Sequence, residues 1–133
     1  MRVVVDANVL FALAKHSSAA NDIFSRFGLE LVAPDFSMVE LYKYREALEK
    51  KSENGPFEEI MSTLKRKVTF VDVREYGLML KTAQSLLPDI KDAAYLALAL
   101  KLRLPIWSND RHLSDQSVTL VFSTEELIDL LSR

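Results

Sequence analysis

The chain has 133 residues, of which 49% are hydrophobic and 27% are charged, a composition typical of a soluble globular protein with one hydrophobic core. It has no cysteine, which excludes disulfides, thiolate metal sites and cysteine nucleophiles. The formal net charge of −2 excludes a general electrostatic attraction to nucleic acid, so any such binding must depend on local basic groups.

No apolar stretch is long enough to span a bilayer, because the longest, residues 93–100, falls far short of a membrane helix. The apolar start of the chain lacks the basic leader of a signal peptide and meets Asp6 at once. We therefore expect a single domain over residues 1–133, located in the cytoplasm and without a membrane segment.

The first expected element is a strand over Val3 to Val5, three β-branched residues in a row. Such a run suits a strand that is buried on both faces of a parallel sheet. Asp6 follows directly, at the carboxyl end of the strand, where ligands gather in open parallel sheets. Asp6 is therefore a candidate metal ligand, with the alternative that Asp6 or Asn8 only caps the next helix.

Two helices and a second strand are expected next. The pattern predicts a short helix from Asn8 to Lys15, and a second helix that Ser17 or Ser18 caps and Gly28 ends. The apolar stretch from Leu29 to Ala33 reads as the second strand, bounded by Pro34. Together these elements form a right-handed βαβ crossover.

A long helix is expected over about Ser37 to Lys51. Glu40 lies three residues after Ser37, which is the spacing of a capping box and needs no catalytic role for Glu40. Lys43 shares the side of the helix that carries Glu40. The segment from Ser52 to Pro56 is expected to be a turn between helices rather than a domain linker.

The middle of the chain alternates helix and strand. A helical stripe begins at Phe57, and residues 68–71 form the third expected strand. A second stripe runs from Tyr76 to Leu87 and is stopped by Pro88. A helix over residues 89–102 is apolar all round in its centre, so we expect it to be largely buried.

This buried helix begins with two acids. Asp89 is well placed as the N-cap, and Asp92 lies in the first turn, where the helix dipole favours negative charge. Both acids are explained by helix stability alone. The same position, however, points them at the edge of the sheet where Asp6 lies.

The last expected elements are strands over residues 104–107 and 118–121 and a helix in which Ser123 and Glu126 match a capping box. Ser108 and Asp110 follow the fourth strand, so another acid stands at a strand's carboxyl end. The whole pattern predicts a three-layer α/β/α domain with a central parallel sheet of about five strands.

Four acids share this geometry, two after strands and two in first turns of helices: Asp6, Glu40, Asp92 and Asp110. Four carboxylates packed together repel one another unless a cation is present. Oxygen-only ligation suits Mg²⁺ or Mn²⁺ rather than zinc. A carboxylate-held metal pair is suited to in-line displacement at phosphorus, and a single-metal variant stays open.

At these residues the chain resembles the PIN-domain family, the metal-dependent ribonucleases that include VapC-like toxins. The matching pieces, in order, are VVDANVLF, SMVEL, DIKDAAYLALAL and IWSNDRHL, which together cover nearly the whole chain.

The resemblance implies that Asp6, Glu40, Asp92 and Asp110 are an acidic quartet that binds Mg²⁺ or Mn²⁺ and carries catalysis. It implies a strand order of 3-2-1-4-5, single-stranded RNA or RNA loops as substrate, an antitoxin partner and a homodimer. Asp89 is a candidate auxiliary ligand whose N-cap role we favour, and Asp115 is placed too loosely to assign. Candidate substrate contacts are Asn8, Ser108, Arg111 and Lys43.

Two other interpretations stay open. One is a PIN-like module that binds RNA or protein without catalysis. The other is a phospho-acceptor receiver domain with Asp72 after the third strand. It is disfavoured because the first strand ends in the single acid Asp6 and Ser123, not lysine, follows the fifth strand.

Overall fold

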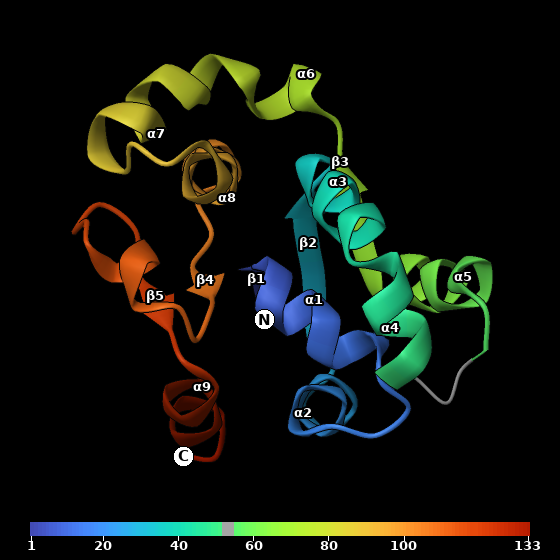
Figure 1. The fold of residues 1–133 in the computed structure, drawn as a ribbon. Coiled ribbons are helices and arrows are strands. Elements are labelled where there is room, and N and C mark those ends of the chain that lie inside the picture. The colour runs from blue at the N-terminus through green and yellow to red at the C-terminus, as the bar shows by residue number, and fades with distance from the viewer. Residues whose placement is uncertain (52–54) are drawn as a thin grey trace.

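The computed structural model describes residues 1–51 and 55–133, and it contains a five-stranded sheet in the order β3-β2-β1-β4-β5. Every neighbouring pair in the sheet is parallel. The strands are β1 (Arg2–Val5), β2 (Glu30–Pro34), β3 (Val68–Val71), β4 (Ile106–Trp107) and β5 (Val121–Phe122). The expected fold class and strand order are confirmed, with β1 at the centre of the sheet (Figure 1).

Helices cover both faces of this sheet. The α-helices are α1 (Ala7–Ala14), α2 (Ala19–Phe27), α3 (Phe36–Lys43), α4 (Arg45–Lys51), α5 (Phe57–Lys67), α6 (Val73–Tyr76), α7 (Leu80–Leu86), α8 (Ile90–Leu102) and α9 (Thr124–Leu131). In the described residues, the 3₁₀ helix η1 (Gly77–Met79) lies between α6 and α7, and the 3₁₀ helix η2 (Arg111–Ser114) lies between β4 and β5.

Alternate residues of β1 serve two separate cores. Val3 and Val5 pack with residues of α1 to α5 and α9, whereas Val4 packs with residues of α6, α7 and α8. All three valines are fully buried. The unbroken apolar run therefore reflects a strand with helices on both faces, as the sequence predicts.

The expected long helix from Ser37 to Lys51 is wrong in two respects. The helix is broken at Tyr44, whose ring packs edge-on against Phe11 at a centroid distance of 5.6 Å. The capping box of Ser37 and Glu40 does not form, because Ser37 lies inside α3. Its buried hydroxyl donates to the Tyr95 hydroxyl at 3.1 Å instead.

Strands β4 and β5 are shorter than expected. Leu104 lies outside β4 because its backbone N–H donates to the Ala99 carbonyl and closes the end of α8. Val118 and Thr119 lie outside β5 because their backbone N–H groups both donate to the Gln116 side chain at 2.8 Å. Backbone groups committed in this way are not available to a sheet ladder.

The predicted caps of α2 and α9 are confirmed, whereas one further predicted helix is divided into shorter ones. Ser18 caps α2, Gly28 ends it in the left-handed region with a φ of 59°, and Ser123 forms its capping box with Glu126. The expected helix from Tyr76 to Leu87 is split among α6, η1 and α7. Residues 52–54 of the expected turn lie outside the described residues.

In the part of the chain that the structure describes, no helix combines the length and the apolar character needed to cross a membrane.

Candidate metal centre

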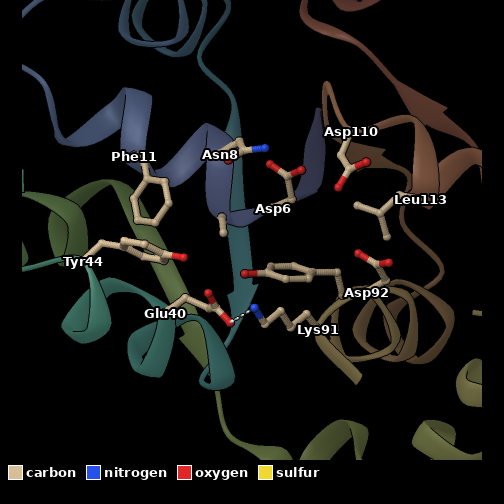
Figure 2. A pocket seen from close by; sticks show the side chains of 11 residues that line it. Asp6, Asn8, Phe11, Glu40, Tyr44, Lys91, Asp92, Asp110 and Leu113 are labelled. Atoms are coloured by element: carbon tan, nitrogen blue, oxygen red, sulfur yellow. Dashed lines mark ion pairs between the residues drawn. The ribbon is translucent and has the colours of Figure 1, made fainter. Parts of the chain in front are cut away.

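The candidate centre lies where β1 and β4 end side by side. Val5 pairs with Trp107 in the parallel ladder, so the next residues, Asp6 and Ser108, stand together at the carboxyl edge of the sheet. Asp6 is only 4% exposed. One of its carboxylate oxygens accepts a hydrogen bond from the Val9 backbone N–H at 3.0 Å, and the other accepts from the Ser108 hydroxyl. Asp6 therefore caps α1 and also faces the pocket (Figure 2).

Ser108 links two of the acids. Its buried hydroxyl donates to Asp6 and accepts from the backbone N–H of Asp110 at 2.9 Å. The Asp110 carboxylate in turn accepts from the His112 N–H at 2.9 Å, which caps η2. This chain of short contacts holds Asp6 and Asp110 beside each other at the strand ends.

The amino end of α8 brings in the third aspartate. Asp92 lies in the first turn of α8 and is half-buried. Asp89 accepts a hydrogen bond from the Lys91 N–H at 3.0 Å, is exposed, and does not line the pocket. The N-cap interpretation of Asp89 is therefore confirmed. Asp115 is also exposed, at the end of η2.

Helix α3 brings in the fourth acid. Glu40 is buried, with a side chain 10% exposed, and one of its carboxylate oxygens lies 3.8 Å from the Lys91 ammonium nitrogen (Figure 2). Lys91 is half-exposed. The buried charge of Glu40 thus has a lysine as its partner, and among residues 1–51 and 55–133 none of the three aspartates forms such an ion pair.

Burial and mutual repulsion act on the aspartates. Burial raises the pKa of Asp6 above its usual value, and the Asp110 charge raises it further, while hydrogen bonds from Ser108 and Val9 lower it. Burial also raises the pKa of Asp92, followed by the charges of Asp89, Asp110 and Asp6. A bound cation offsets such repulsion, so these carboxylates form an electrostatic environment that favours one.

All four predicted acids line one pocket of about 280 Å³. The rest of its lining is mixed: Ala7, Asn8, Phe11, Tyr44, Lys91, Tyr95 and Leu113. The sequence interpretation missed Lys91, Phe11 and Tyr95. Tyr95 sits inside the apolar run of α8, where only its hydroxyl distinguishes it from a core residue.

The four predicted substrate contacts do not lie together in the structure. Asn8 is exposed and lines the acidic pocket. Ser108 is buried beneath Asp6. Arg111 lines a different hollow beyond Asp110, and Lys43 lies on α3 with its ammonium 5.6 Å from the centre of the Tyr44 ring. The pocket itself therefore contains Asn8 but neither Lys43 nor Arg111.

The donor set fits a hard divalent cation, since every candidate ligand is a carboxylate oxygen. Within residues 1–51 and 55–133, however, no three acidic or histidine side chains lie close enough together to coordinate a metal ion as they stand. Binding an ion would therefore require the carboxylates to draw together. Asp92 and Asp110 are only half-buried, which leaves their side chains room to turn.

Two solved structures are similar in fold. One is VapBC2 from Rickettsia felis, determined bound to a DNA fragment from their promoter, with 14% identity, a TM-score of 0.63, and coverage of 92% of this chain and 98% of that chain. The other is PAE2754 from Pyrobaculum aerophilum, with 20% identity, a TM-score of 0.67, and coverage of 99% of this chain and 90% of that chain. No curated protein matches the sequence.

A family comparison goes further than these structures. The family model described as the PIN domain matches residues 4–129, which contain all four acids and every strand from β2 to β5. PIN domains are generally nucleases and generally use divalent metal ions. The chain belongs to the PIN-domain family.

Proposed function

We propose that this protein is an endoribonuclease that depends on Mg²⁺ or Mn²⁺ and hydrolyses phosphodiester bonds of single-stranded RNA. The observation that carries the proposal is the convergence of Asp6, Glu40, Asp92 and Asp110, from four separate elements, on one pocket of a PIN-domain fold. Helix capping explains an isolated acid at a helix start, but it does not explain why four acids, one of them inside α3, line the same hollow.

The carboxylates would hold the cation, which supplies an activated water and neutralises charge at phosphorus. The residues of the chain have distinct parts in this scheme. Asp6 is fixed from two sides by Val9 and Ser108, so it offers a rigid carboxylate at the base of the pocket. Asp92 and Asp110 approach from α8 and from the end of β4, and their partial exposure admits a substrate phosphate.

We further propose that the protein is the toxin of a VapBC-like toxin–antitoxin pair, acts in the cytoplasm, and forms a homodimer. Support comes from the similarity in fold to VapBC2, which was determined with DNA from the promoter of that system. A binding partner that covers the acidic pocket would block entry of RNA, which is the regulation such a pair requires.

The test is cleavage of a fluorescent single-stranded RNA by purified protein with Mg²⁺ or Mn²⁺. Cleavage should appear with either ion, stop in EDTA, and fall to background in Asp92→Asn, which keeps the size of the side chain. Undiminished cleavage in EDTA would contradict the proposal, as would full activity of the variant.

One observation favours a second function, a PIN-like module that binds RNA or a protein without cutting. Glu40 is already paired with Lys91, and no three acids of the described residues lie close enough together to coordinate a metal ion as they stand. This alternative predicts RNA binding without cleavage under every metal condition, and binding that survives Asp92→Asn.

A further inference from the structure

The pocket is divided into two ends of different charge. Figure 2 shows Asp6, Asp92 and Asp110 at one end and the ion pair of Glu40 and Lys91 at the other. The charge of Asp110 raises the pKa values of Asp6 and Asp92, and the charge of Asp6 also raises the pKa of Asp92. The ion pair with Lys91 therefore distinguishes Glu40 from the aspartates.

Lys91 is the only basic residue among those that line the pocket in the described part of the chain. It lies in the first turn of α8, directly before Asp92, and its side chain is 50% exposed. An ammonium group has three N–H donors, and Lys91 lines the pocket with a half-exposed side chain, so the donors that Glu40 does not use are available to a ligand. Lys91 is thus a cation that a phosphate in the pocket can reach.

The pairing also constrains the role of Glu40. An exposed ion pair contributes little to stability, because solvent screens it. Glu40, however, is buried, so removing Lys91 would leave a buried carboxylate without its cationic partner. Among the four acids, Glu40 is thus the one whose carboxylate already has an ion-pair partner in the described part of the chain.

A nucleic-acid strand that enters this pocket faces three carboxylates. Its phosphates carry negative charge, and the protein as a whole has a net charge of −2, so no general attraction offsets the repulsion. A positively charged side chain on the pocket wall would reduce this repulsion by binding a phosphate. Lys91 provides that cation at the end of the pocket away from the aspartates.

We propose that Lys91 binds a backbone phosphate of a single-stranded nucleic acid in this pocket, and that Glu40 positions the Lys91 ammonium instead of coordinating a metal ion. The proposal rests on the proposed function for the class of substrate. It reassigns one member of the expected quartet, and leaves Asp6, Asp92 and Asp110 as the carboxylates for the cation.

Two titrations test the proposal on the same set of variants. The first is fluorescence anisotropy of a short fluorescein-labelled 2′-O-methyl RNA in Ca²⁺ at several KCl concentrations, with a gel to check that the strand stays intact. The second is calorimetry with Mn²⁺ alone. The variants are Lys91→Met, Glu40→Gln, their double mutant and Asp92→Asn. The matched control is Lys101→Met, an exposed lysine near the other end of α8.

Lys91→Met should raise the Kd for RNA about tenfold, as expected for loss of a charged hydrogen bond. It should also reduce the salt slope of log Kd by about 0.7, the value for one phosphate contact on a single strand. Glu40→Gln should raise the Kd for RNA about threefold in the wild-type background and have no effect in the Lys91→Met background, because Glu40 acts through Lys91. Both variants should bind Mn²⁺ as well as the wild type, whereas Asp92→Asn should not.

Two results would overturn the proposal. RNA binding of Lys91→Met equal to that of Lys101→Met would remove Lys91 from the phosphate site. A loss of Mn²⁺ affinity in Glu40→Gln as large as that in Asp92→Asn would make Glu40 a metal ligand. If the wild type itself binds no Mn²⁺, the proposed nuclease function fails, but the RNA comparison of Lys91→Met with Lys101→Met still decides the role of Lys91.

Discussion

The two ends of the acidic pocket are held in different ways. At the aspartate end, Asp6 and Asp110 each cap the helix that follows them, and Ser108 joins the two through short contacts. At the other end, Glu40 depends on a lysine from another helix, and its neighbour Ser37 bonds to a residue 58 positions away. The comparison teaches that a carboxylate can serve as a cap and as a candidate ligand at once, as at Asp6 and Asp110, whereas Glu40 is held by an ion pair with a residue distant in the sequence.

The largest effect is expected at the fixed carboxylate of the aspartate end. Asp6→Asn keeps an acceptor for the Val9 N–H and removes the charge, so the fold should survive. Loss of a carboxylate that holds the cation should lower kcat for RNA cleavage at least about 100-fold. Circular dichroism checks the fold, and an unchanged kcat in a folded variant would contradict the proposed role of Asp6.

A smaller effect is expected at the hydroxyl that supports this carboxylate. Ser108→Ala removes the donor to Asp6, whose hydrogen bond lowers the pKa of that carboxyl. The variant should bind Mn²⁺ about 10-fold to 100-fold more weakly, as is typical when a partner of a metal ligand is lost. Ser114→Ala, an exposed serine in η2, is the control and should bind Mn²⁺ as the wild type does.

The pH dependence of Mn²⁺ affinity should follow the aspartate end. The pKa values of Asp6 and Asp92 are raised above the usual 3.8, and only the deprotonated carboxylates bind a cation. Affinity should therefore fall as pH falls through the raised pKa values, by up to about tenfold per unit for each proton displaced. Calorimetry at a series of pH values measures this, and a flat profile down to pH about 4 would contradict the raised pKa values.

The same shifts predict the sign of a stability change without a cation. A carboxyl group whose pKa is higher in the folded state than in the unfolded chain stabilises the fold most below its usual pKa of 3.8. That contribution is lost as pH rises through the raised pKa. In EDTA, Asp6→Asn should therefore weaken the dependence of the melting temperature on pH in this acidic window.

The smallest effect is expected beside Glu40. Ser37→Ala removes the buried hydrogen bond to the Tyr95 hydroxyl and should lower the free energy of unfolding by about 1 kcal/mol. Mn²⁺ affinity should not change, since Ser37 contacts none of the aspartates in the hydrogen bonds of the described residues. Urea unfolding measures the change, with the exposed Ser62→Ala as a control expected to lie within about 0.5 kcal/mol of the wild type.

Local patterns made much of the fold predictable. The run of valines before Asp6 identified the central strand, and the spacing of Ser123 and Glu126 identified a capping box that forms. Such features depend on neighbours within a few residues, so the sequence displays both partners. The positions of the acids after strands and in helices also pointed to one shared site, and all four acids, Asp6, Glu40, Asp92 and Asp110, line the same pocket.

Contacts between residues far apart in the sequence could not be predicted in the same way. The spacing of Ser37 and Glu40 matched a capping box. In the structure, however, the Ser37 hydroxyl donates to the Tyr95 hydroxyl, and the Glu40 carboxylate pairs with Lys91. The helix breaks at Tyr44, whose ring packs against Phe11 from α1, and no helical periodicity reveals such a contact between distant residues. Lys91 could have been singled out only by its position between two acids at the start of a buried helix.

The central claim is that the aspartates of this pocket bind a divalent cation, and a calorimetric Mn²⁺ titration of the wild type beside Asp110→Asn tests it most directly. Saturable binding by the wild type that is weakened at least about tenfold in the variant is the predicted result. Equal affinity in the two proteins, or no binding by the wild type, would contradict the claim.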